Sequence, residues 1–232
     1  METISKIELR NLQIEDYLEL RASMIEAYSG IEDAPWKEHE IKKLLSIFPQ
    51  GQLVVLADEK VVGCALSLII DDKDIDDNHT YEEITGNYTF STHNPSGDIM
   101  YGIDVFIHPK YRGLRLGRRL YDKRKELAEQ LNIRAIMFAG RIPNYSKYAE
   151  EISPKQYIEK VRMKELFDPV LAFQLSNDFH VKKIMKNYLE GDTHSLDYAV
   201  LMEWNNIYYD KSPKLINSEK SIVRLGLIQW QI

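Results

Sequence analysis

The sequence has a single cysteine, Cys64, and it lacks long apolar runs, internal repeats and an excess of basic residues. One cysteine excludes an intrachain disulfide framework, so an oxidising compartment is not implied. No stretch reaches the roughly 20 apolar residues of a membrane helix, and the amino terminus lacks the pattern of a secretory signal. We therefore expect a cytoplasmic protein that does not engage a membrane.

The formal net charge is −6, and the six histidines show no spacing typical of metal ligands. A general nucleic-acid-binding protein normally presents a basic surface, so we expect no nucleic-acid partner. Without a cluster of cysteine and histidine, we expect no metal either. The 232 residues, 44% of them hydrophobic, are enough for one main folded domain.

Hydrophobic periodicity predicts that strands and helices alternate along the chain. We expect strands at residues 4–9, 53–57, 61–70, 100–107, 133–139, 181–188 and 196–204, and helices at residues 14–28, 33–48, 116–131 and 152–177, the last interrupted at 168–169. Residues 58–60 should close a tight hairpin. Residues 71–98 are too long for a plain connection and are either a substrate loop, which we favour, or a mobile loop. The alternation predicts an α/β (α+β) domain with a mixed, mainly antiparallel sheet and helices on both faces.

Residues 101–131 join a strand to a helix through a basic turn that contains glycine. Four arginines crowd the start of this helix: Arg112, Arg115, Arg118 and Arg119. The helix dipole disfavours cations there, so we expect an anion. A pyrophosphate suits the turn, because first-turn N–H groups can surround its oxygens while Gly113 and Gly117 permit close approach. The alternatives are a solvated basic helix end and a nucleic-acid patch.

This segment resembles the acyl-CoA-binding core of the GNAT family of N-acetyltransferases. In that family a strand with the pattern V-x-hydrophobic-x-P leads into R-x-x-G-x-G/A. The matching residues here are Val105, Ile107, Pro109, Arg112, Arg115 and Gly117. Arg115 stands where the family has its middle glycine. The order of expected elements over residues 1–205 is also similar to the family's, so the resemblance implies the GNAT fold.

The resemblance implies an enzyme that transfers an acetyl group from acetyl-CoA, its co-substrate, to a small-molecule or protein amine. The implied acetyl-CoA-binding residues are Val105, Phe106 and Ile107 along the pantetheine arm, and Arg112, Gly113, Leu114, Arg115, Leu116, Gly117 and Arg118 around the pyrophosphate. The alternative, motivated by Arg115 and Gln174, is a CoA-binding regulatory or docking module with little or no catalysis.

Acyl transfer to an amine needs a base, an N–H donor for the carbonyl and an acid for the leaving thiol. Asp104 is the candidate base, because a carboxylate in an apolar strand is expensive to bury without a task or a partner. A purely structural hydrogen-bond acceptor is the alternative. The resemblance implies the Val105 N–H as the donor. It also places the family's acidic tyrosine at Gln174, which leaves Tyr145, Tyr101 or solvent as the acid.

The acceptor amine is expected to meet the loop of residues 71–98. Its candidate binding residues are Tyr81, Glu82, Glu83 and His93. Histidine titrates near neutral pH and carboxylates bind ammonium groups, which suits an amine substrate. A solvated loop without such a role is the alternative.

Two further segments, 140–145 and 168–179, resemble the acetyltransferase half of bacterial proteins that join this domain to a nitrilase-type carbon-nitrogen hydrolase. Residues 221–232 are similar to the first strand of that hydrolase. We therefore expect an acetyltransferase domain at 1–207, a linker at 208–220 and the start of a truncated hydrolase domain at 221–232, whose missing remainder is a partner in cis. We expect no amidase activity from this chain, because Cys64 lies far upstream of any hydrolase segment. An exposed apolar strand at 222–232 would favour a homo-oligomer.

Overall fold

The computed structural model describes residues 4–28, 35–74 and 78–212. These residues form a seven-stranded sheet with the strand order β1-β2-β3-β4-β5-β7-β6. The strands are β1 (Ile7–Asn11), β2 (Leu53–Ala57), β3 (Lys60–Ile70), β4 (Ile99–Ile107), β5 (Ala135–Arg141), β6 (His180–Met185) and β7 (Ala199–Asn205). Neighbouring strands are antiparallel except β4 and β5, which are parallel. The predicted mixed, mainly antiparallel sheet is confirmed.

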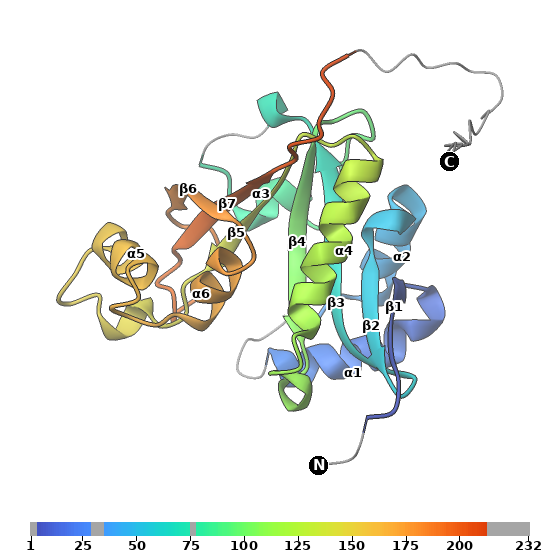
Figure 1. The fold of residues 1–232 in the computed structure, drawn as a ribbon, viewed down its shortest axis with the longest axis horizontal. Coiled ribbons are helices and arrows are strands. Elements are labelled where there is room, and N and C mark those ends of the chain that lie inside the picture. The colour runs from blue at the N-terminus through green and yellow to red at the C-terminus, as the bar shows by residue number, and fades with distance from the viewer. Residues whose placement is uncertain (1–3, 29–34, 75–77, 213–232) are drawn as a thin grey trace, which may run out of the picture.

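Helices cover both faces of the sheet (Figure 1). One face carries α1 (Tyr17–Ala27), α2 (Glu38–Ile47) and the short α3 (Tyr81–Thr85), and the other carries α4 (Leu116–Gln130), α5 (Pro154–Arg162) and α6 (Pro169–Leu175). Each face has its own core of buried apolar side chains, so the sheet separates two hydrophobic layers. Within the described residues, no helix is both long and apolar enough to cross a membrane.

Local sequence explains where the elements begin and end. The β2–β3 hairpin turns at Asp58 and Glu59, whose φ angles of 47° and 70° are typical of a type I′ turn. The interruption predicted at 168–169 is confirmed, because buried Asp168 caps α6 and Pro169 begins it, although α5 already ends at Arg162. The loop at 71–98 contains α3, which sequence periodicity missed because the helix has only five residues.

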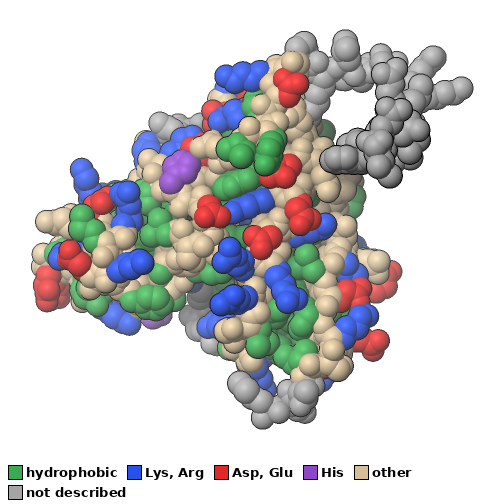
Figure 2. Space-filling model, viewed as in Figure 1, with side chains coloured by type: hydrophobic (Ala, Val, Ile, Leu, Met, Phe, Trp, Pro, Cys, Tyr) green, Lys and Arg blue, Asp and Glu red, His purple; other side chains and the backbone are tan. Residues whose placement is uncertain are grey.

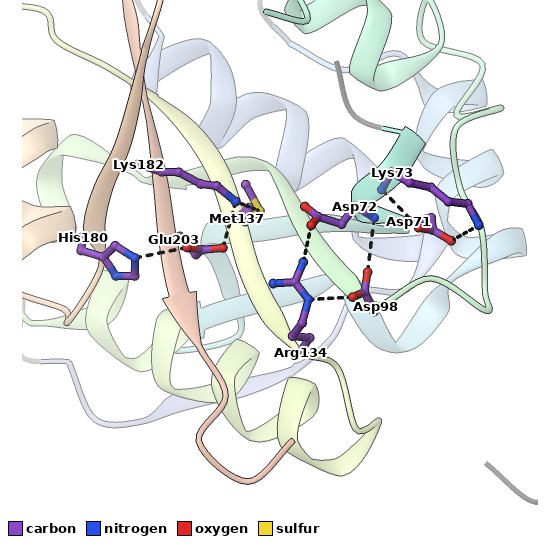
Figure 3. A network of polar contacts seen from close by, with 9 residues as sticks. All are labelled: Asp71, Asp72, Lys73, Asp98, Arg134, Met137, His180, Lys182 and Glu203. Carbon is purple, nitrogen blue, oxygen red and sulfur yellow. Dashed lines mark hydrogen bonds and ion pairs between the residues drawn. The ribbon is translucent and has the colours of Figure 1, made fainter. Parts of the chain in front are cut away.

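The first residues of β4 and β5 are fixed to each other by charged contacts (Figure 3). Arg134, just before β5, donates from Nε to Asp98, just before β4, at 2.7 Å, and its guanidinium also pairs with Asp72 at 2.8 Å. Arg134 N–H further donates to the Asp98 carbonyl at 2.8 Å. These contacts hold the two parallel strands together at one end, and the candidate site lies at the other.

Candidate functional site

The strands β4 and β5 separate after three paired positions. They pair only at Ile99↔Ala135, Met100↔Ile136 and Tyr101↔Met137, although β4 continues to Ile107 and β5 to Arg141. Figure 1 shows the two ribbons diverging toward the N-terminal end of α4. The facing edges of residues 102–107 and 138–141 therefore have no partner strand within the described part of the chain.

The β3–β4 ladder decides which backbone groups of β4 face this gap. His108 N–H donates to the Val62 carbonyl of β3 at 2.8 Å, and Ile107 is opposite Gly63. Because backbone groups alternate sides along a strand, the peptide groups of Phe106 face β3 and those of Val105 and Ile107 face β5. Val105 and Ile107, expected to bind pantetheine, thus turn their backbone groups toward the gap. The Ile107 carbonyl there accepts from Arg112 Nε at 3.3 Å, and the Val105 N–H also hydrogen-bonds the Asp104 carboxylate.

A β-bulge re-aims the side chains in the middle of β4. Leu66 is opposite Asp104 while the next residue, Ser67, is opposite Gly102, which leaves Ile103 as the extra residue. The bulge puts the Ile103 and Asp104 side chains on the same face, toward α1 and α2. Asp104 therefore lies beside the gap but points to the face opposite α4.

Two aromatic side chains hold the Asp104 carboxylate. The Tyr28 hydroxyl donates to Oδ1, and Trp36 Nε1 donates to Oδ2 at 2.8 Å. Burial raises the pKa of Asp104 above its ordinary value of 3.8, although these hydrogen bonds oppose the shift. A carboxyl with a raised pKa is a stronger base than an ordinary aspartate once ionised, as the proposed role requires.

The basic turn leads into α4 through two left-handed residues. Gly113 has φ 83° and Arg115 has φ 58°, and α4 begins at Leu116. Arg115, the residue in the family's glycine position, thus adopts the left-handed conformation that glycine adopts without strain. It provides no side-chain cap, so the first N–H groups of α4 have no intrahelical partner.

The N-terminal end of α4 is strongly basic. Arg112, Arg115, Arg118 and Arg119 are exposed, and the first turn of α4 contains no acidic residue. Within the described residues none of the four forms an ion pair, while Arg112 Nε donates to the Ile107 carbonyl at 3.3 Å. Lys and Arg side chains gather around this half of α4, whereas its other half also carries acidic side chains (Figure 2). The charge and the unpaired N–H groups together suit a phosphate group.

Gly117 has a packing role that the motif alone does not reveal. A Cβ at this position would lie 2.9 Å from Cζ of Phe173 on α6. The Phe173 ring also packs on Tyr121, with 5.1 Å between ring centroids. Gly117 therefore allows α6 to approach the start of α4, in addition to any close approach of a ligand.

Gln174, in the position of the family's acidic tyrosine, is buried against β5. A Cβ at Gly140 would overlap its carboxamide, and its Oε1 has no hydrogen-bond partner in the described structure. The carboxamide lies beside the Tyr121 hydroxyl of α4, and their hydrogen bond partly opposes the rise in the Tyr121 pKa caused by burial. A hydroxyl beside this position therefore comes from Tyr121, which sequence reasoning missed.

The two tyrosines predicted as acids are buried and already hydrogen-bonded. Tyr101 is 0% exposed and lies between His79 Nε2 at 2.8 Å and the Tyr188 hydroxyl at 3.2 Å. Tyr145 donates to the Ile152 carbonyl at 3.3 Å within the cluster around α5. Burial is the main cause that raises the pKa of both hydroxyls. The structure does not bring Tyr145 into contact with Asp104.

The four predicted acceptor residues separate into different surroundings. The Tyr81 hydroxyl donates to the Ile103 carbonyl at 3.1 Å, and its ring is 6.4 Å from that of Trp36, so it belongs to the Asp104 side of the sheet. Glu83 forms the capping box of α3 with the N-cap residue Thr80, and Glu82 is exposed. His93 lies on the other face: its ring stacks on Phe48, and its Nδ1 accepts from the Ile69 N–H at 3.1 Å.

The comparisons with known proteins agree with this geometry. The model of the acetyltransferase (GNAT) family matches residues 17–149. The chain belongs to this family. It is 36% identical to the uncharacterized N-acetyltransferase YkwB of Bacillus subtilis (strain 168), over 76% of this chain and 78% of that protein.

Two further similarities come from a longer protein and from a solved structure. The probable hydrolase YhcX of Bacillus subtilis (strain 168) is 41% identical over 98% of this chain, and the chain spans only 44% of that relative's length. The crystal structure of the loading GNATL domain of CurA from Lyngbya majuscula has a TM-score of 0.75 and 25% identity, over 87% of this chain and 98% of that domain.

Proposed function

We propose that this GNAT domain transfers an acetyl group from acetyl-CoA to an amine, with acetyl-CoA bound in the gap between β4 and β5. The observation that carries the proposal is the continuity of the gap with the basic turn. The backbone of Val105 and Ile107 faces the gap, and the strand leads directly to Arg112 and the first N–H groups of α4. The extended pantetheine arm of acetyl-CoA needs a strand edge with which to pair, and its pyrophosphate needs a basic turn next to that strand. The gap and the turn provide these two surfaces in this order.

The acetyl-CoA-binding part would rest largely on backbone groups. Val105 and Ile107 would pair with the amides of the pantetheine arm as a neighbouring strand would. The N–H groups of residues 112–118 would bind the pyrophosphate, and the four arginines would add charge-assisted hydrogen bonds. The left-handed φ of Arg115 supports this assignment, because the backbone at this position has the conformation that the family's glycine would adopt.

Asp104 is the proposed base. Its carboxylate lies on the face of β4 toward α1 and α2, so an amine would approach from that face while the thioester lies in the gap. The carboxylate takes a proton from the incoming ammonium, directly or through water. The amine nitrogen then attacks the thioester carbon and the C–N bond forms. The C–S bond breaks with release of the thiolate, and the nitrogen loses its second proton to solvent to give the amide.

Three tyrosines are candidates for stabilising or protonating the thiolate. The Tyr101 and Tyr145 hydroxyls are hydrogen-bonded to other groups, and the Tyr121 hydroxyl is hydrogen-bonded to Gln174, the residue in the position of the family's acidic tyrosine. Because burial keeps Tyr121 neutral, its hydroxyl would act as a hydrogen-bond donor to sulfur. Solvent would then supply the proton.

The acceptor side is rich in aromatic rings. Trp36 and Tyr81 contact Tyr88, which borders a surface hollow of about 540 Å³. Glu40 also lines this hollow, and burial raises the pKa of the Tyr88 hydroxyl, with Glu82 and Glu40 close enough to add to the rise. Aromatic faces and carboxylates both attract ammonium groups, so we propose that the amine enters past Tyr88 and Tyr81.

The test is release of free thiol from acetyl-CoA across a panel of small amines and peptide amines. The proposal predicts amine-dependent thiol release that Asp104→Asn reduces. The second candidate function, a CoA-binding module without catalysis, is favoured by the buried carboxamide of Gln174 where the family has a hydroxyl. Tight binding of acetyl-CoA without thiol release for any amine would support that module instead.

We also propose that residues 208–220 link this domain to a hydrolase domain that begins at 221–232. The similarity to a longer protein named a probable hydrolase supports this organisation. Residues 213–232 lie outside the described residues, so the strand expected there stays a prediction. Light scattering of this chain and of one ending at residue 217 would test it, because an unpaired apolar strand should increase self-association.

A further inference from the structure

Arg124 is a buried cation on the sheet-facing side of α4. It is 1% exposed, and within the described residues no carboxylate lies within ion-pair distance of its guanidinium. Burial lowers the pKa of this arginine, and its Cζ lies 5.9 Å from the centroid of the Tyr121 ring. Burying a charge lowers the stability of the fold unless the charged group is hydrogen-bonded, so the contacts of Arg124 should indicate its structural or functional role.

Those contacts are two backbone carbonyls at the β4 bulge. Nη2 of Arg124 donates to the Leu66 carbonyl of β3 at 3.0 Å and to the Asp104 carbonyl of β4 at 3.1 Å. Gly102 provides the space, because a Cβ there would lie 2.7 Å from Nη1. The guanidinium thus replaces the ladder bonds that the bulge disrupts, and it fixes the peptide between Asp104 and Val105.

This peptide has its two ends on opposite sides of β4. A trans peptide points its C=O and N–H in opposite directions. The Asp104 carbonyl shares Arg124 with the Leu66 carbonyl, so it points toward β3. The Val105 N–H therefore points toward β5, into the gap assigned to acetyl-CoA. The same N–H hydrogen-bonds the Asp104 carboxylate and thereby lowers the pKa of that group, so the thioester carbonyl would share this donor with Asp104.

A cation that binds the C=O of a peptide group changes the donor strength of the N–H of the same peptide group. Hydrogen bonding to the C=O shifts electron density toward oxygen and makes the N–H of the same peptide a stronger donor. Both hydrogen bonds come from Nη2, so one nitrogen of the guanidinium serves the two carbonyls, while Nε has no hydrogen-bond partner in the described structure. The effect is strongest where water is excluded, as it is around Arg124.

We propose that Arg124 is a positioning residue for acyl transfer: it holds the bulge and polarises the Asp104–Val105 peptide, whose N–H binds the thioester carbonyl. The inference rests on the proposed function. It goes beyond that function because it gives a role to a side chain that touches neither the thioester nor the amine. The negative charge that develops on the carbonyl oxygen in the transition state meets a donor strengthened by a cation on the other side of the strand.

The test follows the carbonyl stretch of acetyl-CoA, labelled with ¹³C at its carbonyl and bound to the protein, by infrared difference spectroscopy. The variants are Arg124→Met, which keeps the side-chain length without a charge, and Arg124→Lys. The matched control is Lys123→Met, which removes an exposed cation from the adjacent position of α4. Calorimetry measures the affinity of each variant for acetyl-CoA, and thiol release with the best amine gives kcat and KM.

The proposal predicts that wild-type protein lowers the bound carbonyl frequency below that of free acetyl-CoA, and that Arg124→Met removes most of this shift. Its kcat should fall about tenfold or more with little change in acetyl-CoA affinity, because weakening a transition-state donor affects kcat rather than binding. Arg124→Lys should be intermediate and Lys123→Met unchanged.

An unshifted carbonyl in the wild-type complex would overturn the proposal even if both Arg124 variants failed to fold. So would an Arg124→Met protein with the full frequency shift and normal kcat, and in that case the acetyltransferase function would still stand. Absence of acetyl-CoA binding by wild-type protein would instead contradict the proposed function itself.

Discussion

At the scale of single residues, Asp104 carries the strongest prediction. Asp104→Asn keeps the shape of the side chain but cannot accept a proton, so kcat should fall by about a hundredfold or more while acetyl-CoA affinity stays nearly constant. Burial raises the pKa of Asp104, so wild-type kcat/KM should fall as the pH drops through a value above the ordinary aspartate range. Stopped-flow thiol detection across pH measures both effects.

The acidic limb of that pH profile distinguishes a base from a structural acceptor. It should disappear in Asp104→Asn, because the titrating group is gone. Trp36→Phe, which removes only the Nε1 donor to Asp104, is expected to move the limb to higher pH, since the lost hydrogen bond had favoured the carboxylate. A normal rate and profile in Asp104→Asn would leave it a structural residue.

The leaving-group side gives a second residue prediction. Tyr121→Phe should lower kcat about tenfold by removing a hydrogen bond to the departing sulfur. Tyr148→Phe is the matched control, because it removes a hydroxyl from the same apolar cluster without touching Gln174. Thiol release at saturating substrate measures the difference, and equal rates for the two variants would assign the thiolate to another donor or to solvent.

Sequence reasoning reached some site residues and missed others for a physical reason. Asp104 could be predicted as a site residue because a carboxylate in an apolar strand is unusual in itself. Tyr28 and Trp36 were not, since they contact Asp104 from 76 and 68 residues away in sequence. The burial of Arg124 does have a sequence signal: it falls on the leucine-lined face of its helix, four residues after Leu120.

At the scale of elements, the basic turn makes a prediction about backbone conformation. Arg115→Gly and Arg115→Val remove the same charge, but only glycine accepts φ 58° without strain. We expect Arg115→Val to weaken acetyl-CoA binding clearly more than Arg115→Gly, because the valine backbone would be driven from the left-handed path. Titration calorimetry of the pair at one ionic strength reports the difference, and equal affinities would mean that the turn's backbone does not bind the ligand.

The junction of α5 and α6 depends on one buried carboxylate. Asp168 accepts from the N–H groups of Val170 and Leu171 at the start of α6, and from the Tyr157 hydroxyl of α5 at 2.9 Å. Asp168→Ala should lower the free energy of unfolding by roughly 2–4 kcal/mol, because it removes a cap and leaves buried donors unpaired. Chemical denaturation measures this, with Asp122→Ala, an exposed aspartate of α4, as the control. Equal losses in the two variants would contradict the account.

Helices and strands could be predicted where hydrophobic periodicity was strong or where turn residues marked the ends of an element. The expected limits of β2 were correct to the residue, and the limits of β3 and β4 to within one residue, because buried strands are bounded by turn residues. The α3 helix was missed since five residues are too few for a helical period, and its signal is the Thr80–Glu83 capping box. The separation of β4 from β5 has no local signature at all, because it depends on how far two distant strands stay paired.

At the scale of the whole molecule, the fold brings two separate chemistries to one strand. β4 faces α4 and the basic turn that we propose binds phosphate on one side, and Tyr28, Trp36 and the proposed amine entrance on the other. The contacts of Arg134 close the far end of the β4–β5 pair, so the strands can diverge only toward the N-terminal end of α4. Acyl donor and amine would thus meet across the bulge without sharing a surface.

The most direct test of this account is a calorimetric titration of the chain with acetyl-CoA. We predict saturable binding of one acetyl-CoA per chain, weakened by Arg112→Ala and by added salt because the phosphate contacts are charged. The bound ligand should stabilise the fold by about 2.7 kcal/mol at a hundredfold excess over its dissociation constant. No heat of binding at millimolar acetyl-CoA, with the melting temperature unchanged, would contradict the assignment of the gap between β4 and β5 as an acyl-CoA site.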